Sequence, residues 1–232
     1  MKRTVFLDPQ TSLFHTRGIS PPSEPPNNRF IAAGAPHPES ERDLYRVLLA
    51  SARSFINENG DDADMLAKAR FDEWSVRDLS EIFGGHPGTI CRRLARTEQR
   101  LRIHVLGDAA IWLGRSCFGF TLSPQTATPM AGVDAYAVSI HKHERVVDGE
   151  ASRDAWMRYL TDKWQALCDP HECKETGELR ATYLGGFRCV RTDKTFLDIS
   201  VLVADRDEAM QIGTTEHQQC IYDLRRGMTI QL

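Results

Sequence analysis

The sequence predicts an α+β protein with an all-helical N-terminal half and a mixed C-terminal half. Apolar residues recur at helical spacing from about residue 40 to residue 102, whereas short alternating segments, typical of strands, follow residue 133. Between these regions the composition shifts to Gly, Ser, Thr and Pro, which is typical of a linker. Four segments are expected: an arm (1–38), a helical domain (39–115), a linker (116–132) and an α+β domain (133–232).

Charge is unevenly distributed along the 232 residues, although the net charge is only −3. Residues 75–104 contain six arginines against three acidic residues, whereas residues 133–232 contain thirteen basic against seventeen acidic residues. A surface that binds nucleic acid would therefore be a local patch in the first of these regions. No apolar run approaches the roughly 20 residues of a membrane span, and the six cysteines are scattered. We expect a cytoplasmic protein with reduced thiols and no membrane partner.

Proline dominates the arm, which carries seven of the eleven prolines. Proline fixes φ and lacks a backbone N–H, so residues 1–38 are expected to be a mostly extended, mobile arm without a packed structure. The alternative is a short strand at residues 4–7 that docks elsewhere. Two helices should follow: one capped by Ser40 and ended by Asn59-Gly60, and one over residues 61–71.

A helix-turn-helix is predicted from about Ser75 to Arg102. Ser75 is the expected N-cap of a short helix with one apolar side, made of Val76, Leu79, Ile82 and Phe83. Gly84-Gly85 supplies the left-handed conformation of a sharp turn, and Pro87 suits the first turn of a second helix. That helix buries Ile90, Leu94 and Leu101 and carries arginines on its other faces, which can bond phosphate oxygens or guanine edges in the major groove.

The segment SVRDLSEIFGGHPGTICRRLARTEQRLR resembles the fourth region of bacterial sigma factors, especially the small alternative ones. Residues 78–84 and 88–90, followed by Arg93-Leu94, occupy the places of the family pattern. The resemblance covers about 30 of the 232 residues and implies that the second helix reads promoter DNA. It places Thr89, Arg92, Arg93 and Arg96 nearest to the DNA, with His86 and Gly88 at the turn. Arg100 extends the same basic helix.

Two departures from the family pattern limit what the resemblance implies. Gly85 replaces an apolar residue, and the family's second region, which holds core polymerase and opens the promoter, has no counterpart. A DNA-binding regulator, bacterial or phage-borne, is therefore expected rather than a working sigma factor. Its partner would be double-stranded DNA. The alternatives for the module are contact with an RNA polymerase subunit or pairing with itself as a homodimer, or a solvated structural surface.

The α+β domain is expected to follow the order β-α-β-β-α-β, which matches a ferredoxin-like sandwich. In its first helix, Trp156 is expected to be a core residue. In the strand that follows, Gly185-Gly186 indicates a bulge or a close backbone approach. Asp205 is expected to cap the second helix. In the third strand, Asp198 and Ser200 point away from an apolar face. The expected elements are a strand (135–147), a helix (152–168), two strands (183–190 and 195–203), a helix (205–212) and a last strand (220–224), with a hairpin partner at 228–232.

Residues that suggest enzymatic or metal chemistry are sparse. Cys168, His171 and Cys173 lie close in sequence, but their spacing is irregular for a zinc site, and a helix end at Asp169-Pro170 with buried thiols is the favoured explanation. His141 and His143 would share one face of a strand as surface histidines. No nucleophile motif, phosphate loop or carboxylate pair accompanies them, so we expect neither catalysis nor a cofactor.

The sequence therefore favours a sequence-specific DNA-binding regulator whose C-terminal domain senses a ligand, dimerises or binds a partner. The alternative is an accessory protein of a phage or mobile element whose C-terminal domain carries an enzymatic or interaction role, with the helical region as an adaptor. A purely structural role is the third hypothesis, and it predicts no salt-dependent DNA affinity.

Overall fold

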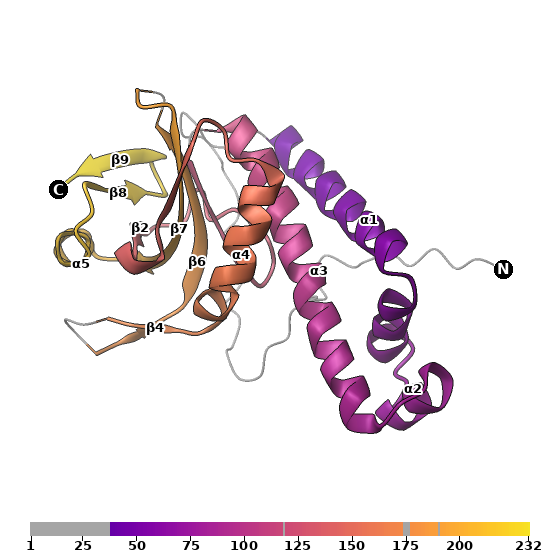
Figure 1. Ribbon diagram of the computed structural model, residues 1–232. Coiled ribbons are helices and arrows are strands. Elements are labelled where there is room, and N and C mark those ends of the chain that lie inside the picture. Colours follow the sequence, from indigo (N-terminus) through magenta and orange to yellow (C-terminus); the bar gives the residue numbers. More distant parts are fainter. Residues whose placement is uncertain (1–37, 118, 174–176, 190) are drawn as a thin grey trace.

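The computed structural model describes residues 38–117, 119–173, 177–189 and 191–232, and it combines helices with an antiparallel sheet (Figure 1). The helices are α1 (Pro38–Phe71), α2 (Val76–Phe83), α3 (Pro87–Ser116), α4 (Arg153–Cys168), α5 (Arg206–Thr215) and a short 3-10 helix, η1 (His141–His143). The strands are β1 (Gly119–Leu122), β2 (Tyr136–Ser139), β3 (Arg145–Asp148), β4 (His171–Glu172), β5 (Leu179–Arg180), β6 (Thr182–Cys189), β7 (Lys194–Val203), β8 (Cys220–Asp223) and β9 (Met228–Gln231). The predicted α+β class is confirmed. Except for Pro38, the predicted arm lies outside the described residues.

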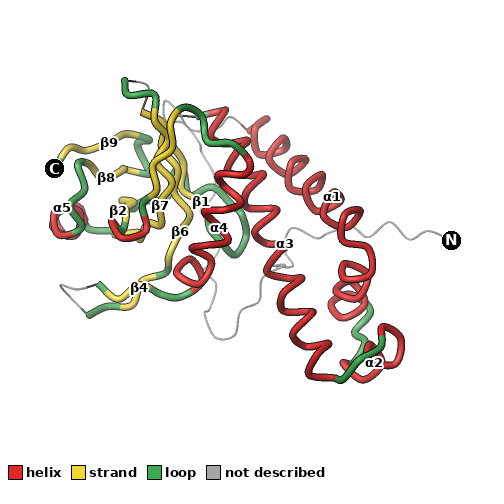
Figure 2. Tube along the Cα trace, viewed as in Figure 1, coloured by secondary structure: helices red, strands yellow, loops and turns green. Residues whose placement is uncertain are grey.

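Helices α1 and α3 lie side by side, and α2 joins them at the end far from the sheet (Figures 1 and 2). The backbone of α1 breaks at Gly60, which has φ 39° and ψ −114°, so the predicted stop at Asn59-Gly60 and the helix over 61–71 are confirmed. The predicted cap is wrong: α1 begins at Pro38, two residues before Ser40. Proline at a helix start loses no intrahelical hydrogen bond, because the first N–H groups have no partner there.

Helix α3 is continuous over 30 residues and enters the core of the sheet region. Its second half buries Leu106, Ala109 and Leu113 in the same apolar cluster as Trp156 of α4 and Leu197 of β7. The helices and the sheet therefore share one hydrophobic core. A second, smaller cluster lies at the opposite end of α3, and its fully buried members are Met65, Leu79 and Ile90.

The main sheet is antiparallel, with strand order β1-β6-β7-β2-β8-β9, and β3 pairs with the other end of β7. Strand β1 lies inside the segment predicted as a linker, where Gly119–Leu122 pairs with β6. The predicted strand over residues 135–147 is interrupted: β2 ends at Ser139, η1 follows, and the chain returns to β7 as β3. A small second sheet pairs β4 with β5.

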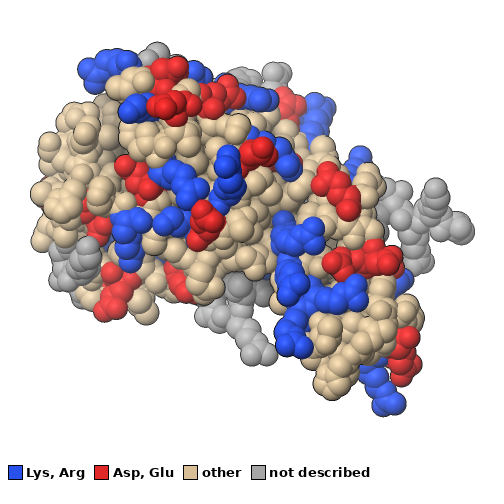
Figure 3. All heavy atoms as spheres, viewed as in Figure 1, with Lys and Arg blue, Asp and Glu red and all other residues tan. Residues whose placement is uncertain are grey.

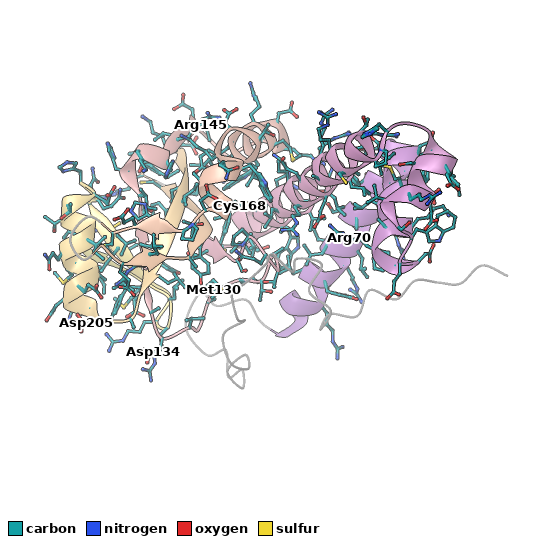
Figure 4. All side chains as sticks on the ribbon, turned by 90° about the horizontal axis from the view of Figure 1, so that it is seen from below. Arg70, Met130, Asp134, Arg145, Cys168 and Asp205 are labelled. Atoms are coloured by element: carbon teal, nitrogen blue, oxygen red, sulfur yellow. The ribbon has the colours of Figure 1, made fainter. Side chains whose placement is uncertain are left out.

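The two faces of the main sheet differ in character. Leu197 and Ile199 of β7 face the helices and pack in one cluster with Trp156 and with Ile212 of α5. Asp198 points to the other face, as the alternation predicts, yet only 7% of it is exposed. Loop residues cover part of this second face, where Met130 packs near Ala137 and Leu224, and Figure 4 shows Met130 and Asp134 across the sheet from Arg145.

The predicted close approach at Gly185-Gly186 is confirmed, because both glycines pair with β7 in regular register and lie under bulky neighbours. A Cβ atom at Gly186 would lie 2.6 Å from Phe120 Cζ and 2.9 Å from Trp156 Cη2. We expect Gly186→Ala to lower the free energy of unfolding by about 1–3 kcal/mol, because both rings are held in the core. Urea denaturation of the variant and the wild type measures this difference. Gly149→Ala is unsuitable as a control because its φ is +68°, so Gly114→Ala, with 3.9 Å to Phe120, serves instead.

Candidate nucleic-acid interface

Helix α2 begins with a complete capping box. The Oγ of Ser75 accepts the N–H of Asp78 at 3.2 Å, and the Asp78 carboxylate accepts the N–H of Ser75 at 2.9 Å. Hydrogen bonds from the Ser75 side chain and backbone hold the pKa of Asp78 below its ordinary value. The predicted cap at Ser75 is therefore confirmed, and it satisfies two N–H groups that a helix start leaves free.

The turn between α2 and α3 consists of three residues, Gly84, Gly85 and His86. The φ angles of the two glycines are +71° and +107°, so the predicted need for glycine in this turn is confirmed. His86 caps α3, because its Nδ1 accepts the N–H of Gly88 at 3.1 Å, and Pro87 occupies the first helical position. The short turn and the two caps fix where α3 starts relative to α2.

The small cluster holds the two helices together. Leu79 of α2 and Ile90 of α3 are fully buried against Met65 of α1, as the apolar spacing predicts. Ile82 departs from the prediction, because 58% of it is exposed. The buried side of α2, which packs against α1 and α3, therefore does not extend to Ile82.

Three of the predicted DNA-contacting residues lie free on the outer side of α3. Thr89, Arg92 and Arg96 are all exposed, as are His86 and Gly88 at the turn. Among the described residues, neither Arg92 nor Arg96 forms an ion pair or a hydrogen bond through its side chain. The two arginines are four residues apart and therefore share one side of the helix. They present two uncompensated charges near the start of α3.

The other two predicted arginines are held by α1 instead. The Arg93 guanidinium binds the Asp62 carboxylate, with its NH2 group 2.6 Å from Oδ1 and its Nε at 3.2 Å. Arg100 donates to the Asn59 side-chain oxygen and lies over the Phe55 ring, 5.8 Å from the centroid. These contacts flank the break at Gly60 and fix α3 against both halves of α1.

An ion network between α1 and α3 was missed by the sequence analysis. Arg102, expected on a solvated face, is 9% exposed and binds Glu98 at 2.7 Å, and Arg70 binds the same carboxylate at 2.5 Å. Burial raises the pKa of Glu98, but the hydrogen bonds from Arg70 and Arg102 outweigh it, so the pKa is below its ordinary value. The sequence indicates only one contact of this network, because Glu98 and Arg102 are four residues apart on one helix.

Lys and Arg side chains gather over the N-terminal half of α3 on the face shown in Figure 3, whereas Lys and Arg are interspersed with Asp and Glu over the sheet region and α4. No family model matches this chain. No curated protein and no solved structure shows significant similarity to it. Among the described helices, none combines the length and apolar character that a bilayer crossing requires.

The weaker candidates lie in the sheet region. His141 and His143 lie in η1 rather than on a strand, so the prediction that they share a strand face is wrong. Helix α4 ends at Cys168, as the Asp169-Pro170 signal predicts, while His171 begins β4 and Cys173 is buried. Within the described part of the chain, no three His, Cys, Asp or Glu side chains are placed to hold a metal ion.

Proposed function

We propose that the protein is a sequence-specific DNA-binding regulator and that α2 and α3 form its helix-turn-helix. The observation that carries this proposal is the pair Arg92 and Arg96, two unpaired charges on the exposed side of a helix that a capped three-residue glycine turn positions. Most arginines near them are paired, as Arg93 is with Asp62. An arginine that keeps its charge unpaired beside a helix start is suited to bond phosphate or a guanine edge.

The resemblance to sigma region four supports the same proposal. Residues 78–84 comprise most of α2 and the first glycine of the turn, and residues 88–90 lie in the first turn of α3, so the residues that carry the resemblance lie in the two helices of the proposed module. We propose that α3 enters the major groove with His86, Thr89, Arg92 and Arg96 nearest to the bases. Arg93 and Arg100 then act through α1, since their side chains are already held.

DNA binding that depends on Arg92 and Arg96 is the expected result. We expect Arg92→Ala/Arg96→Ala to weaken binding to duplex DNA at least tenfold and to reduce the salt slope by about 1.8, because two phosphate-neutralising charges are lost. Fluorescence anisotropy with random and promoter-rich duplexes at several salt concentrations measures both quantities. The matched control is Arg53→Ala/Arg206→Ala, two exposed arginines on α1 and α5.

The control double variant separates a local effect of Arg92 and Arg96 from an effect of total charge. If both double variants weaken binding equally, the effect reflects total charge and the helix-turn-helix proposal fails. If the wild type binds no duplex at any salt concentration, the DNA-binding proposal fails, and protein contact or a structural role remains for the module.

We further propose that the C-terminal half is built on the ferredoxin-like plan. Its support is the central strand order β6-β7-β2-β8, in which the four strands alternate in direction while α4 and α5 pack in one cluster on one face. Strands β1 and β9 would be additions at the two edges. Because α3 shares this core, the domain that senses a ligand or a partner would be rigidly joined to the recognition helix.

A further inference from the structure

Strand β9 forms one edge of the main sheet, and its outer side has no strand partner among the described residues. On its inner side it pairs with β8, where the N–H of Leu232 bonds the Gln219 oxygen at 3.1 Å. Because backbone groups alternate in direction along an antiparallel strand, the N–H and C=O groups of Thr229 and Gln231 point outward. These outward groups form no backbone hydrogen bond within the described ranges.

The apolar residues of β9 share one face of the strand. Met228, Ile230 and Leu232 alternate with Thr229 and Gln231, so their side chains lie on the same side of the sheet. Ile230 packs against the large core, whereas Met228 is 50% exposed and Leu232 is 39% exposed. The strand contains neither a charged residue nor a proline. Edge strands usually carry such residues to prevent pairing with other chains, so β9 is an unprotected edge.

The opposite edge of the sheet differs, because the chain itself covers it. The N–H of Met130 bonds the Thr121 oxygen of β1 at 2.8 Å, and Leu122 forms a bridge with Pro129. The loop that follows β1 thus occupies backbone groups that a further strand would need. Of the two edge strands, β9 is the one that is open to a partner.

We infer that β9 pairs with β9 of a second copy of this chain, antiparallel and centred on Ile230. In this register Thr229 of one copy lies opposite Gln231 of the other, and their outward N–H and C=O groups bond in both directions. Ile230 lies opposite its own counterpart, and Met228 lies opposite Leu232 of the other copy. The strand therefore supplies both halves of the interface, as a two-fold axis requires.

The charges beside β9 favour the antiparallel orientation. Arg225 and Arg226 immediately precede the strand. Antiparallel pairing about Ile230 separates the Arg226 residues of the two copies by about 27 Å along the strand, which exceeds the Debye length at physiological ionic strength. Parallel pairing would instead bring the arginines of the two copies side by side. Between the arginines the two strands meet without like charges, because residues 227–232 carry none.

The size and place of this edge define the kind of dimer. Residues 228–232 span only about 17 Å, so the interface is smaller than the about 800 Å² per partner of a stable complex. We therefore expect a dimer that dissociates on dilution. Figures 1 and 2 show β9 at the end of the molecule far from α2, so pairing leaves the candidate nucleic-acid interface of both copies uncovered. The dimer stands whether or not that interface binds DNA.

Sedimentation velocity of the full chain under reducing conditions, from about 10 μM to about 1 mM protein, measures the dimer. We expect the wild type to shift from monomer toward dimer over this range. Met228→Lys places a charge on the edge, and Thr229→Pro removes an outward N–H that β8 does not use, so each should raise the dissociation constant at least tenfold. The matched control Leu179→Lys changes an exposed apolar residue of β5 and should dimerise as the wild type does.

A wild type that stays monomeric up to the highest concentration would overturn the inference, as would Met228→Lys and Thr229→Pro variants that dimerise as tightly as Leu179→Lys. Unchanged far-ultraviolet circular dichroism of the variants would show that the loss of dimer is not a loss of fold. The register has its own test in Ile230→Cys, which should form an intermolecular disulfide on mild oxidation, because the Cα atoms of such a pair lie about 4.5 Å apart. Cross-linking no greater than that of the wild type, with its six native cysteines, would contradict pairing centred on Ile230.

Discussion

Leu79→Ala is expected to unfold the helix-turn-helix locally while the sheet region keeps its cooperative transition. Leu79 is fully buried, and only Met65 and Ile90 are equally buried around it. Truncating a buried leucine costs about 2–5 kcal/mol, which is large for a cluster with three fully buried members. Hydrogen exchange followed by mass spectrometry should show lost protection over residues 61–95, and DNA affinity should fall with it.

Leu106→Ala is the matched control, because it makes the same change at an equally buried position of α3. Leu106 belongs to the large shared core, so this variant should lower the midpoint of the whole thermal transition and expose helices and sheet together. Uniform loss of protection in Leu79→Ala would show that the small cluster is no separate unit. Such a difference would let the α2–α3 end of the molecule unfold locally while the sheet region stays folded.

The caps of α2 and α5 and the turn before α3 were predictable because the interactions that form them are local, although the predicted cap at Ser40 was wrong. Ser75 caps α2 through a residue three positions away, and Asp205 caps α5 in the same way, with its carboxylate accepting the N–H of Glu208 at 2.9 Å. Gly84 and Gly85 are likewise required by their own φ angles. Such interactions are fully specified within four or five residues of sequence, so the sequence analysis found the elements that position the candidate interface.

The features that were missed depend on which surface lies opposite. A helical projection of α3 alone shows Arg93 and Arg100 as exposed as Arg92, but α1 packs on one side and supplies Asp62 and Asn59. Arg102 is likewise buried in the folded protein. No local pattern in the sequence reports that an acidic residue thirty positions earlier will lie beside an arginine.

The sheet region shows the same limit. Residues 116–132 have the composition of a linker, yet Gly119–Leu122 becomes β1 because the edge of β6 offers it backbone partners. The 3-10 turn of η1 was not predicted either, and it places the backbone oxygen of Lys142 3.5 Å from the Nζ of Lys163 on α4. Strand pairing and contacts between distant elements are decided by tertiary structure, which outweighs local propensity.

Substituting Asp198 is expected to have the second large effect on stability, because Asp198 is a buried carboxyl group with no cationic partner among the residues described. Burial raises its pKa from the ordinary 3.8 to about 6, although hydrogen bonds from Ser200 and Ser139 act in the opposite direction. Gly185 opposite it admits the side chain, since a Cβ there would lie 2.0 Å from the Asp198 Oδ1. Between pH 3.8 and about 6 the folded protein keeps a proton that the unfolded chain has lost, so the contribution of Asp198 to stability falls as the pH rises.

We therefore expect Asp198→Asn to be more stable than the wild type at pH 7, by at most about 3 kcal/mol, with the difference vanishing below about pH 4. His143 acts in the opposite sense: its folded pKa of about 4 lies below the ordinary 6.5, so stability falls as the pH drops from 6.5 toward 4. In the wild type the pH dependences due to Asp198 and His143 partly cancel. In Asp198→Asn only the loss of stability at acidic pH that His143 causes should remain. Urea denaturation at half-unit intervals from pH 3.5 to 7.5 measures the free energy of unfolding of both proteins. If Asp198→Asn is less stable than the wild type at pH 7, the folded protein stabilises the ionised carboxylate of Asp198. That result would contradict the assignment of Asp198 as a buried carboxyl group without a cationic partner.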